Sequence, residues 1–367
     1  MHVDEVELRV VRLPYKSVFK TSFAAESEKV AVIATVRSDG VEGYGEGVMD
    51  SLPSYREESI VGALHLLREA LVPWLLENGC DDPMLLCDRW AGWRGNPMAK
   101  TTLELAVWDC HARQIGVPLR TLLRGDRTEI PVGASLGMNP VPETVASVQR
   151  HVEQGYKRIK LKIEPGWDLE MLSAVRAEFP DIELTVDANS AYSLDDLDTL
   201  HAIDEFDLHY IEQPLHWDDL TDHATLAPQM KTRLCLDETL TSPARTKAAL
   251  DLGACAVVNV KVGRVGGLAA TKQIHDLCVA RGVPMWCGGM LETGIGRAHN
   301  IHVATMPGFV YPGDTASASR TYARDITEQA LEATDGIMPV PPGPGIGVTL
   351  DRAFLDTVTE SVEVLRR

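Results

Sequence analysis

Five short apolar runs decide the fold of this chain: RIKLKI (158–163), LTVDAN (184–189), YIEQP (210–214), LCLDE (234–238) and VVNVKV (257–262). Each run carries a charged residue near its end, and these residues are Lys162, Asp187, Glu212, Asp237 and Lys261, which lie 25, 25, 25 and 24 positions apart. A strand, a crossover helix and two short loops need a segment of about this length. The repeat therefore predicts an α/β fold built from successive parallel strands.

Units of this kind either open into a doubly wound sheet or close into a barrel, whose catalytic groups lie at the C-terminal ends of the strands. The first strand is predicted in IPVGASLG (130–137), and six helical patterns separate the later strands without a long irregular gap. We therefore expect a TIM-type (β/α)7β barrel over 128–320. Its seventh and eighth strands are predicted in PMWCGG (284–289) and GFVYPGD (308–314).

The segments on either side of the barrel are expected to form a capping domain. Within 1–127, the alternating runs VELRVVRL (6–13) and KVAVIATVRS (29–38) predict an antiparallel sheet, and helical apolar patterns follow them. This predicts an α+β unit. The pattern changes again after 320, so we expect 321–367 to return to the cap, with the active site between cap and barrel.

The charged strand ends are expected to meet at the barrel mouth, with the lysines on strands two and six and the carboxylates between them. Because side chains alternate along a strand, Lys160 shares a face with Lys162, where repulsion and burial are expected to lower a lysine pKa toward the range of a base. Three convergent carboxylates repel one another unless they bind a cation, and oxygen ligands favour a hard ion such as Mg²⁺. The sequence therefore predicts a metal site at Asp187, Glu212 and Asp237.

The composition of the chain argues against some classes of binding partner. A net charge of −18 without a basic cluster argues against nucleic acid and anionic membranes as partners, and it says little about the substrate. The first ten residues carry acids where a signal peptide needs a basic start and an apolar core, and no apolar run approaches membrane-spanning length. A cytoplasmic location is therefore expected. The seven cysteines lack metal-binding spacing and are predicted to be buried free thiols.

Several motifs together resemble the muconate-lactonising subgroup of the enolase superfamily. They are KLK (160–162), VDAN (186–189), IEQP (211–214), DE (237–238), NVKVGRVGG (259–267) and GGMLETGIGR (288–297). YKRIKLKIEPGWD (156–168), GGMLETGIGRAHN (288–300) and PGDTASASR (312–320) are similar, more narrowly, to its o-succinylbenzoate synthase and N-succinylamino acid racemase branch. The similarity runs along the whole chain.

The resemblance implies a role for each matching residue. Asp187, Glu212 and Asp237 become the ligands of Mg²⁺, or of Mn²⁺ or another divalent cation in its place. Lys162 and Lys261 become the acid/base pair, one for each face of a carboxylate substrate. Supporting or substrate-contact roles are implied for Lys160, Asn189, Glu238, Arg264, Ser135, Phe19, Phe23, Met49, Tyr55 and Leu291.

Specificity is expected to come from the residues that cover the barrel mouth, which are Phe19, Phe23, Met49, Tyr55 and Leu291. They are apolar or aromatic and lack a carboxylate placed for an ammonium group. They therefore suit a hydrophobic acid whose amine is absent or acylated.

The implied reaction removes a proton α to a carboxylate and gives a metal-stabilised enediolate. Loss of water would then make the enzyme an o-succinylbenzoate synthase, a lyase of menaquinone biosynthesis. Return of a proton would make it an N-succinylamino acid racemase, an isomerase. The family commonly assembles, so a homo-oligomer is expected.

Other reactions fit the sequence less well. A dipeptide epimerase would usually carry DxD on strand eight, where this chain has Asp314 followed by Thr315 and Ala316. Sugar-acid dehydratases commonly use a histidine base where this chain has Lys261. A muconate-type cycloisomerase stays open, and a non-catalytic barrel is disfavoured because every ligand and base position carries a competent residue type.

Overall fold

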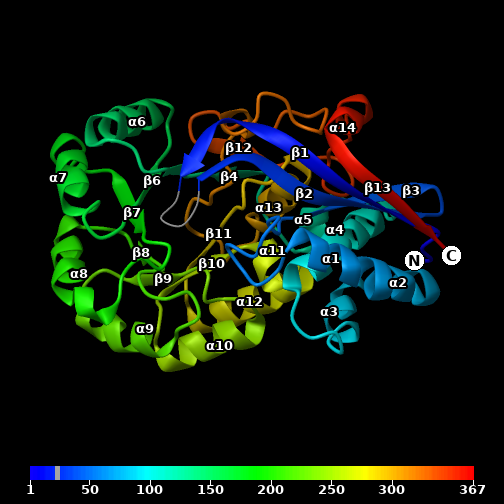
Figure 1. Cartoon of the computed structure of the whole chain (residues 1–367), viewed down its shortest axis with the longest axis horizontal. Coiled ribbons are helices and arrows are strands. Elements are labelled where there is room, and N and C mark those ends of the chain that lie inside the picture. The colour runs from blue at the N-terminus through cyan, green and yellow to red at the C-terminus, as the bar shows by residue number, and fades with distance from the viewer. Residues whose placement is uncertain (21–24) are drawn as a thin grey trace.

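The computed structural model of this chain describes residues 1–20 and 25–367. A curled sheet of seven parallel strands and the helices around it form the larger part of the molecule (Figure 1). The strands follow one another in chain order, each hydrogen-bonded to the next. They are β5 (Ala134–Leu136), β6 (Arg158–Lys162), β7 (Glu183–Asp187), β8 (Ile211–Glu212), β9 (Leu234–Leu236), β10 (Val257–Val260) and β11 (Met285–Cys287). The repeat read from the charged strand ends is therefore present as parallel strands.

Helices alternate with these strands and lie along the outside of the sheet (Figure 1). They are α6 (Val141–Glu153), α7 (Leu169–Glu178), α8 (Leu197–Ile203), α9 (Thr221–Leu226), α10 (Pro243–Leu252), α11 (Val262–Val265), α12 (Leu268–Arg281) and α13 (Gly294–Val303). All six helical segments predicted between the strands are confirmed.

The predicted eighth strand is not a regular strand. Within 308–314, Phe309 forms an isolated bridge with Met285, and Gly313 forms one with Val132 ahead of β5. The amide of Gly133 also donates a hydrogen bond of 2.8 Å to the carbonyl oxygen of Gly313. The structure therefore shows a curled seven-stranded parallel sheet, and the expected count of eight barrel strands is not established.

The predicted first strand, IPVGASLG, is divided between two sheets, which corrects the expectation of one continuous strand. β4 (Glu129–Pro131) pairs antiparallel with β12 (Ile337–Pro339), and only β5 joins the parallel sheet. Gly133 lies between them, where an added Cβ would come within 2.4 Å of the Arg158 guanidinium. Glycine therefore leaves the space that this buried arginine occupies.

The capping domain has a four-stranded antiparallel sheet in the order β13-β1-β2-β3. Its strands are β1 (Glu5–Lys20), β2 (Ala25–Ser38), β3 (Val41–Gly47) and β13 (Thr359–Arg366), and α14 (Arg352–Val358) precedes β13. Its helices are α1 (Ile60–Leu66), the π-helix η1 (Leu67–Leu71), α2 (Val72–Asn78), α3 (Leu86–Arg89), α4 (Pro97–Gln114) and α5 (Leu119–Leu122). The C-terminal strand thus lies against β1, while the predicted domain boundaries at 127/128 and 320/321 stay predictions.

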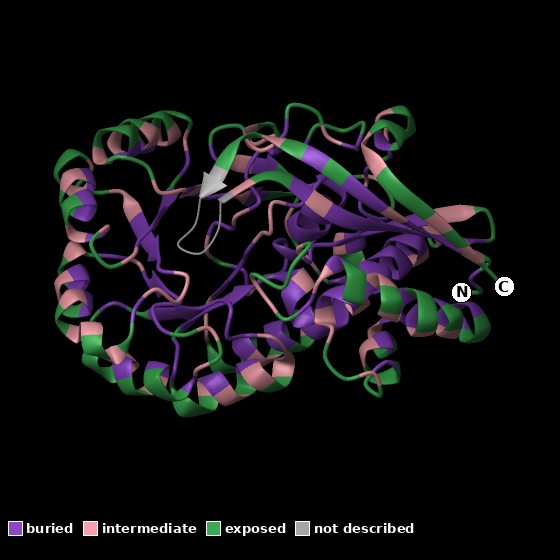
Figure 2. Ribbon diagram, viewed as in Figure 1, coloured by how far each residue is buried: buried purple, intermediate pink, exposed green. Residues whose placement is uncertain are grey.

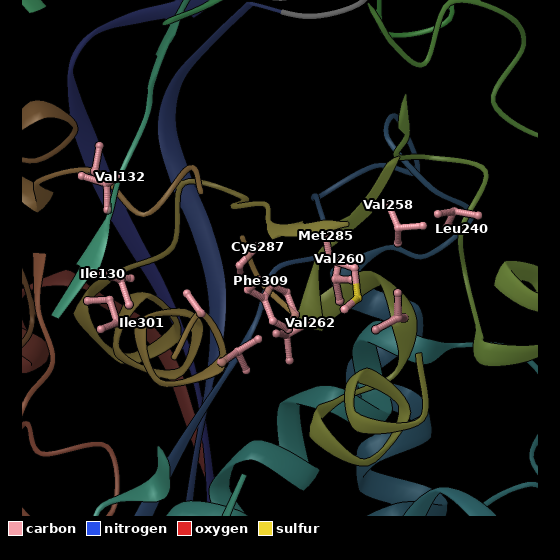
Figure 3. Close-up of a cluster of buried hydrophobic side chains, with 14 of the residues drawn as sticks. Ile130, Val132, Leu240, Val258, Val260, Val262, Met285, Cys287, Ile301 and Phe309 are labelled. Atoms are coloured by element: carbon pink, nitrogen blue, oxygen red, sulfur yellow. The ribbon is translucent and has the colours of Figure 1, made fainter. Parts of the chain in front are cut away.

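The strands of the parallel sheet are mostly buried, and the helices around it alternate buried and exposed residues (Figure 2). The buried apolar residues of both form one hydrophobic cluster. On β10, Val258 and Val260 pack into this cluster with Met285 and Phe309 (Figure 3). The alternate residue Val257 instead packs against Trp286 in a separate small cluster. The next position on that second face is Asn259, and Lys261 follows it, so strand alternation directs the lysine away from the helices.

Two smaller predictions concern buried groups and membrane segments. All seven cysteines are free thiols, as predicted, and six of them are buried, but Cys87 is only half-buried. Among the described residues, no helix is both long enough and apolar enough to cross a bilayer.

Candidate active site

The charged strand ends converge because parallel register brings them level. Lys162 on β6 pairs in register with Asp187 on β7, and Asp187 pairs with Glu212 on β8. Asp237 directly follows β9, and Lys261 directly follows β10. All five residues are at most 8% exposed. The structure therefore brings together the lysines and carboxylates that the sequence predicted.

The first lysine pair lies against the first two carboxylates. The Nζ of Lys162 donates to Oδ2 of Asp187 and to Oδ1 of Asn189, both at 2.6 Å. The Nζ of Lys160 donates to Oε2 of Glu212 at 2.9 Å and lies 3.4 Å from Oδ2 of Asp187. Burial alone would raise the pKa of Asp187, but Lys162 and Lys160 outweigh it and hold this pKa below the usual range.

The expectation that the lysine pair has lowered pKa values is wrong for Lys160. Burial acts to lower its pKa, but the carboxylates of Asp314, Glu212 and Asp187 together raise that pKa above the ordinary value. The ammonium of Lys160 also lies 4.7 Å from the ring centroid of Trp286, an additional favourable contact for a cation. Lys160 is therefore a fixed positive charge beside the carboxylates.

Lys261 approaches from the other side of the carboxylate row. Its Nζ lies 2.8 Å from Oδ2 of Asp237 and donates to the hydroxyl of Tyr55 at 3.1 Å. Burial would lower the pKa of Lys261, but Tyr55, Glu238 and Glu212 raise it above the ordinary value. Three strands, β7 to β9, separate the two lysine positions, so Lys162 and Lys261 reach the site from opposite sides.

Arg264 lies behind Asp237. Its Nη1 forms an ion pair with Oδ1 of Asp237, and its Nη2 donates to the carbonyl oxygen of Asn259 at 2.7 Å. The Nδ2 of Asn259 in turn donates to Oε1 of Glu212 at 2.8 Å. This chain of hydrogen bonds holds two of the three carboxylates from the rear.

The three carboxylates suit a hard divalent cation in chemistry, although they are not grouped as a metal site in this structure. Within the described ranges, no three His, Cys, Asp or Glu side chains lie close enough together to hold an ion. Each carboxylate instead faces an ammonium or guanidinium group. Burial, followed by the charge of Asp187, raises the pKa of Glu212, as expected for crowded acids that a cation would relieve. The oxygen-only donor set fits Mg²⁺ or Mn²⁺.

The lysines open onto a cavity of about 610 Å³ between the cap and the parallel sheet. The predicted residues that line it are Tyr55, Ser135, Lys160, Lys162, Asp187, Asn189, Lys261 and Leu291. Glu212, Asp237, Glu238 and Arg264 are buried behind this wall, and Asn189 donates to Glu238 at 2.8 Å. Most of the predicted residues therefore belong to one cavity and its immediate support.

Two predictions about the cover need correction. Met49 does not line the cavity but is 1% exposed, because it packs into the apolar core of the cap with Val48, Met98 and Ala99. The cavity wall also carries Glu26, Asp50 and Glu292, so the expectation of a cover without carboxylates is wrong. Phe23 lies outside the described residues, and Phe19 is described only as a backbone position at the end of β1.

The sequence reasoning missed the role of Asp314. Its Oδ2 accepts a hydrogen bond of 2.7 Å from Lys160, and its Oδ1 accepts one of 2.7 Å from Arg158. The signal was present, because Asp314 ends the apolar run GFVYP in the same way that the other acids end theirs. Arg158 had no such signal, since an arginine at a strand start is usually exposed.

Comparison with known proteins agrees with this geometry. Residues 5–124 match the mandelate racemase / muconate lactonizing enzyme N-terminal domain, and residues 143–354 match the enolase C-terminal domain-like family. An N-succinylamino acid racemase from Thermus thermophilus is 50% identical over 360 residues, which is 98% of each chain. An o-succinylbenzoate synthase from Geobacillus kaustophilus is 47% identical over 369 residues, which covers 100% of this chain and 98% of the relative.

Solved structures support the same assignment. A crystal structure of an enolase-superfamily member from Listeria innocua superposes with a TM-score of 0.97 at 39% identity. The match covers 100% of this chain and 99% of the other. The family models together span most of the sequence, and the relatives match it from end to end. The chain therefore belongs to the mandelate racemase / muconate lactonizing enzyme family of the enolase superfamily.

Proposed function

We propose that this protein is a divalent-metal-dependent enzyme that removes the proton α to a carboxylate in a succinyl-bearing acid. It would act as an o-succinylbenzoate synthase, as an N-succinylamino acid racemase, or as both. One observation carries the proposal: two buried lysines reach one cavity from opposite sides of a row of three carboxylates. The relatives named above carry these two activities in their names, which supports the choice.

The lysines would divide the proton transfers between them. Lys162 would remove or return the α-proton on one face of the substrate, and Lys261 would do so on the other face. Asn189 and Tyr55 each accept a hydrogen bond from one of these ammonium groups, which fixes the direction of its Nζ. Positioning of this kind is what general acid–base catalysis requires.

Asp187, Glu212 and Asp237 would hold the metal, for which Mg²⁺ is our first choice. When bound, the ion would neutralise the negative charge that develops on the substrate carboxylate as the proton leaves. Lys160 and Arg264 would then balance the remaining charge of these ligands. Asp237 is already oriented by Arg264, and Glu212 by Asn259.

Three further features belong to the proposal. Segment 308–314 would occupy the eighth barrel position, since it contacts both β11 and the residue ahead of β5. The protein would act in the cytoplasm. It would form a homo-oligomer, which size-exclusion chromatography with light scattering would detect.

A side-by-side substrate panel tests the function. We expect dehydration to o-succinylbenzoate or racemisation of N-succinyl-phenylalanine or -methionine, with exchange of the α-hydrogen in D₂O followed by NMR. Dipeptides and sugar acids should be at least about a hundredfold worse in kcat/KM, the range in which an unmatched polar group is rejected. Lactonisation of muconate provides the test of a cycloisomerase.

The panel has a clear negative outcome. The cavity carboxylates Glu26, Asp50 and Glu292 could accept a free ammonium group. If a dipeptide proves the best substrate, the proposal is wrong and an epimerase takes its place.

A further inference from the structure

The cavity continues beyond the lysines toward β5 and α6. There its wall is formed by Ser147, Arg150 and His151 of α6 and by Ser317 and Arg320 of the segment after 314. The Nη2 of Arg320 donates to the carbonyl oxygen of Ser135 on β5 at 3.4 Å. This region, which we call the α6 subsite, is therefore part of the same cavity but lies at the first strand of the parallel sheet.

The two arginines of the α6 subsite lack an ion-pair partner in the described part of the chain. Neither Arg150 nor Arg320 takes part in an ion pair with any residue that the structure describes. Besides its hydrogen bond to Ser135, the guanidinium of Arg320 lies over the ring of Tyr156, 5.7 Å from its centroid. In contrast, Arg158 pairs with Asp314 at 2.7 Å. Arg320 is half-buried, whereas Arg150 is exposed at the rim of the subsite. A half-buried arginine without an acid gives up part of its hydration unpaired, and its planar fork matches a carboxylate.

The charge balance of the surroundings supports an anionic ligand. Burial lowers the pKa of His151, and the positive charges of Arg320 and then Arg150 lower this pKa further. The nearby carboxylate of Asp314 is held by Lys160 and Arg158. The α6 subsite therefore keeps a net positive charge.

The proposed function identifies the anion. The names of the relatives describe two different reactions, but o-succinylbenzoate and N-succinylamino acids share the succinyl group. The reacting carbon must lie between Lys162 and Lys261, so the terminal carboxylate of that group has to lie elsewhere in the cavity. Resting on that function, we propose that Arg320, with Arg150 beside it, binds the terminal carboxylate of the succinyl group in the α6 subsite.

The test compares two substrates that differ only in the terminal group. N-succinyl-phenylalanine carries a carboxylate there, and N-succinamyl-phenylalanine carries a neutral amide of the same length. We expect Arg320→Gln to lower kcat/KM for the succinyl substrate about 10- to 100-fold, as for loss of a charge-assisted hydrogen bond, and to leave the amide within about threefold. Arg320→Lys should recover part of the loss. Arg150→Gln should give a smaller loss, and exposed Arg94→Gln on the cap should give none.

Each outcome decides the proposal. Equal losses for both substrates in the Arg320 and Arg150 variants, or an unchanged preference in Arg320→Gln, would overturn it. If the wild type turns over neither compound and also forms no o-succinylbenzoate, the proposed function fails. The subsite is then decided by thermal shift with the same two compounds, where only the succinyl compound should stabilise the wild type, and Arg320→Gln should remove that stabilisation.

Discussion

At the scale of single residues, the site is a set of matched charges in which no member is independent. Lys160 contacts the carboxylates of Glu212 and Asp314, and Asp314 also holds Arg158. Removing one partner from such a buried network leaves an uncompensated charge and costs several kcal/mol, typically about 3 to 5. Variants of Lys160 and Asp314 would therefore mix loss of stability with loss of activity. Lys162 and Lys261 also pair with the buried acids Asp187 and Asp237, so an unfolding measurement accompanies the activity assay of their variants.

Lys162→Ala and Lys261→Ala should each lower the rate of racemisation by about 10²- to 10⁴-fold, because each lysine serves one face of the substrate. Each variant should still exchange the α-hydrogen of one enantiomer in D₂O, and the surviving enantiomer should differ between the two. NMR of each enantiomer measures this exchange. The exposed Lys247→Ala is the matched control. Exchange of the same enantiomer by both variants would contradict the two-face assignment.

Removal of divalent metal should stop turnover, and Mg²⁺ should restore it, because the proposed reaction needs a cation at Asp187, Glu212 and Asp237. The measurement is activity after exhaustive EDTA treatment, followed by titration with Mg²⁺ and Mn²⁺. Asp237→Asn should raise the Mg²⁺ concentration needed for half-maximal activity, while the surface substitution Glu143→Gln should leave that concentration unchanged. Full activity in the chelated protein would rule out the metal.

At the scale of elements, the buried side chain of Glu104 on α4 of the cap forms hydrogen bonds with the first turn of α12 beside the parallel sheet. The carboxylate of Glu104 accepts hydrogen bonds from the amides of Leu268 and Ala269 at 2.8 and 2.9 Å. Gly267, at φ +105°, is required there, since an added Cβ would lie 2.3 Å from Oε2 of Glu104. A side chain from one unit thus caps a helix of the other.

Glu104 should make stability depend on pH. Burial raises its pKa to about 7, despite the two amides and the indole of Trp108 that act to lower it. The folded state therefore binds this proton more tightly than the unfolded state, so its contribution to the free energy of unfolding falls as pH rises from about 4.5 to 7. Urea unfolding should show that the free energy of unfolding of the wild type falls by on the order of 3 kcal/mol relative to that of Glu104→Gln across this pH range. A constant difference between the two proteins would contradict the assignment.

At the scale of the whole molecule, the two ends of the chain complete one sheet. β13 pairs with β1 in a register that runs from Glu5 opposite Arg366 to Val11 opposite Thr359. Arg366 also forms an ion pair with Glu5, and Arg68 forms one with Glu363. The cap therefore closes only when the last residues have returned from the far end of the sequence.

Deleting residues 359–367 should lower the thermal unfolding midpoint by more than about 5 °C and promote association, since β1 would become an unpaired edge strand. Differential scanning calorimetry and light scattering measure the two effects. Removal of Arg367 alone, which lies beyond β13, is the control and should change neither. A midpoint unchanged in the long deletion would show that the β13 pairing contributes little to stability.

Sequence alone determined the parallel strands and the inward ring of Lys162, Asp187, Glu212, Asp237 and Lys261, because spacing and strand alternation are local properties of the chain. Only the tertiary structure decided which distant groups meet them. Tyr55 reaches Lys261 across 206 positions, and Arg320 reaches Ser135 across 185. The same holds for Met49, whose place in the cap core depends on how helices pack over β3 rather than on its own apolar character. Contacts of this kind depend on the summed packing of many elements, which no periodicity within one segment contains.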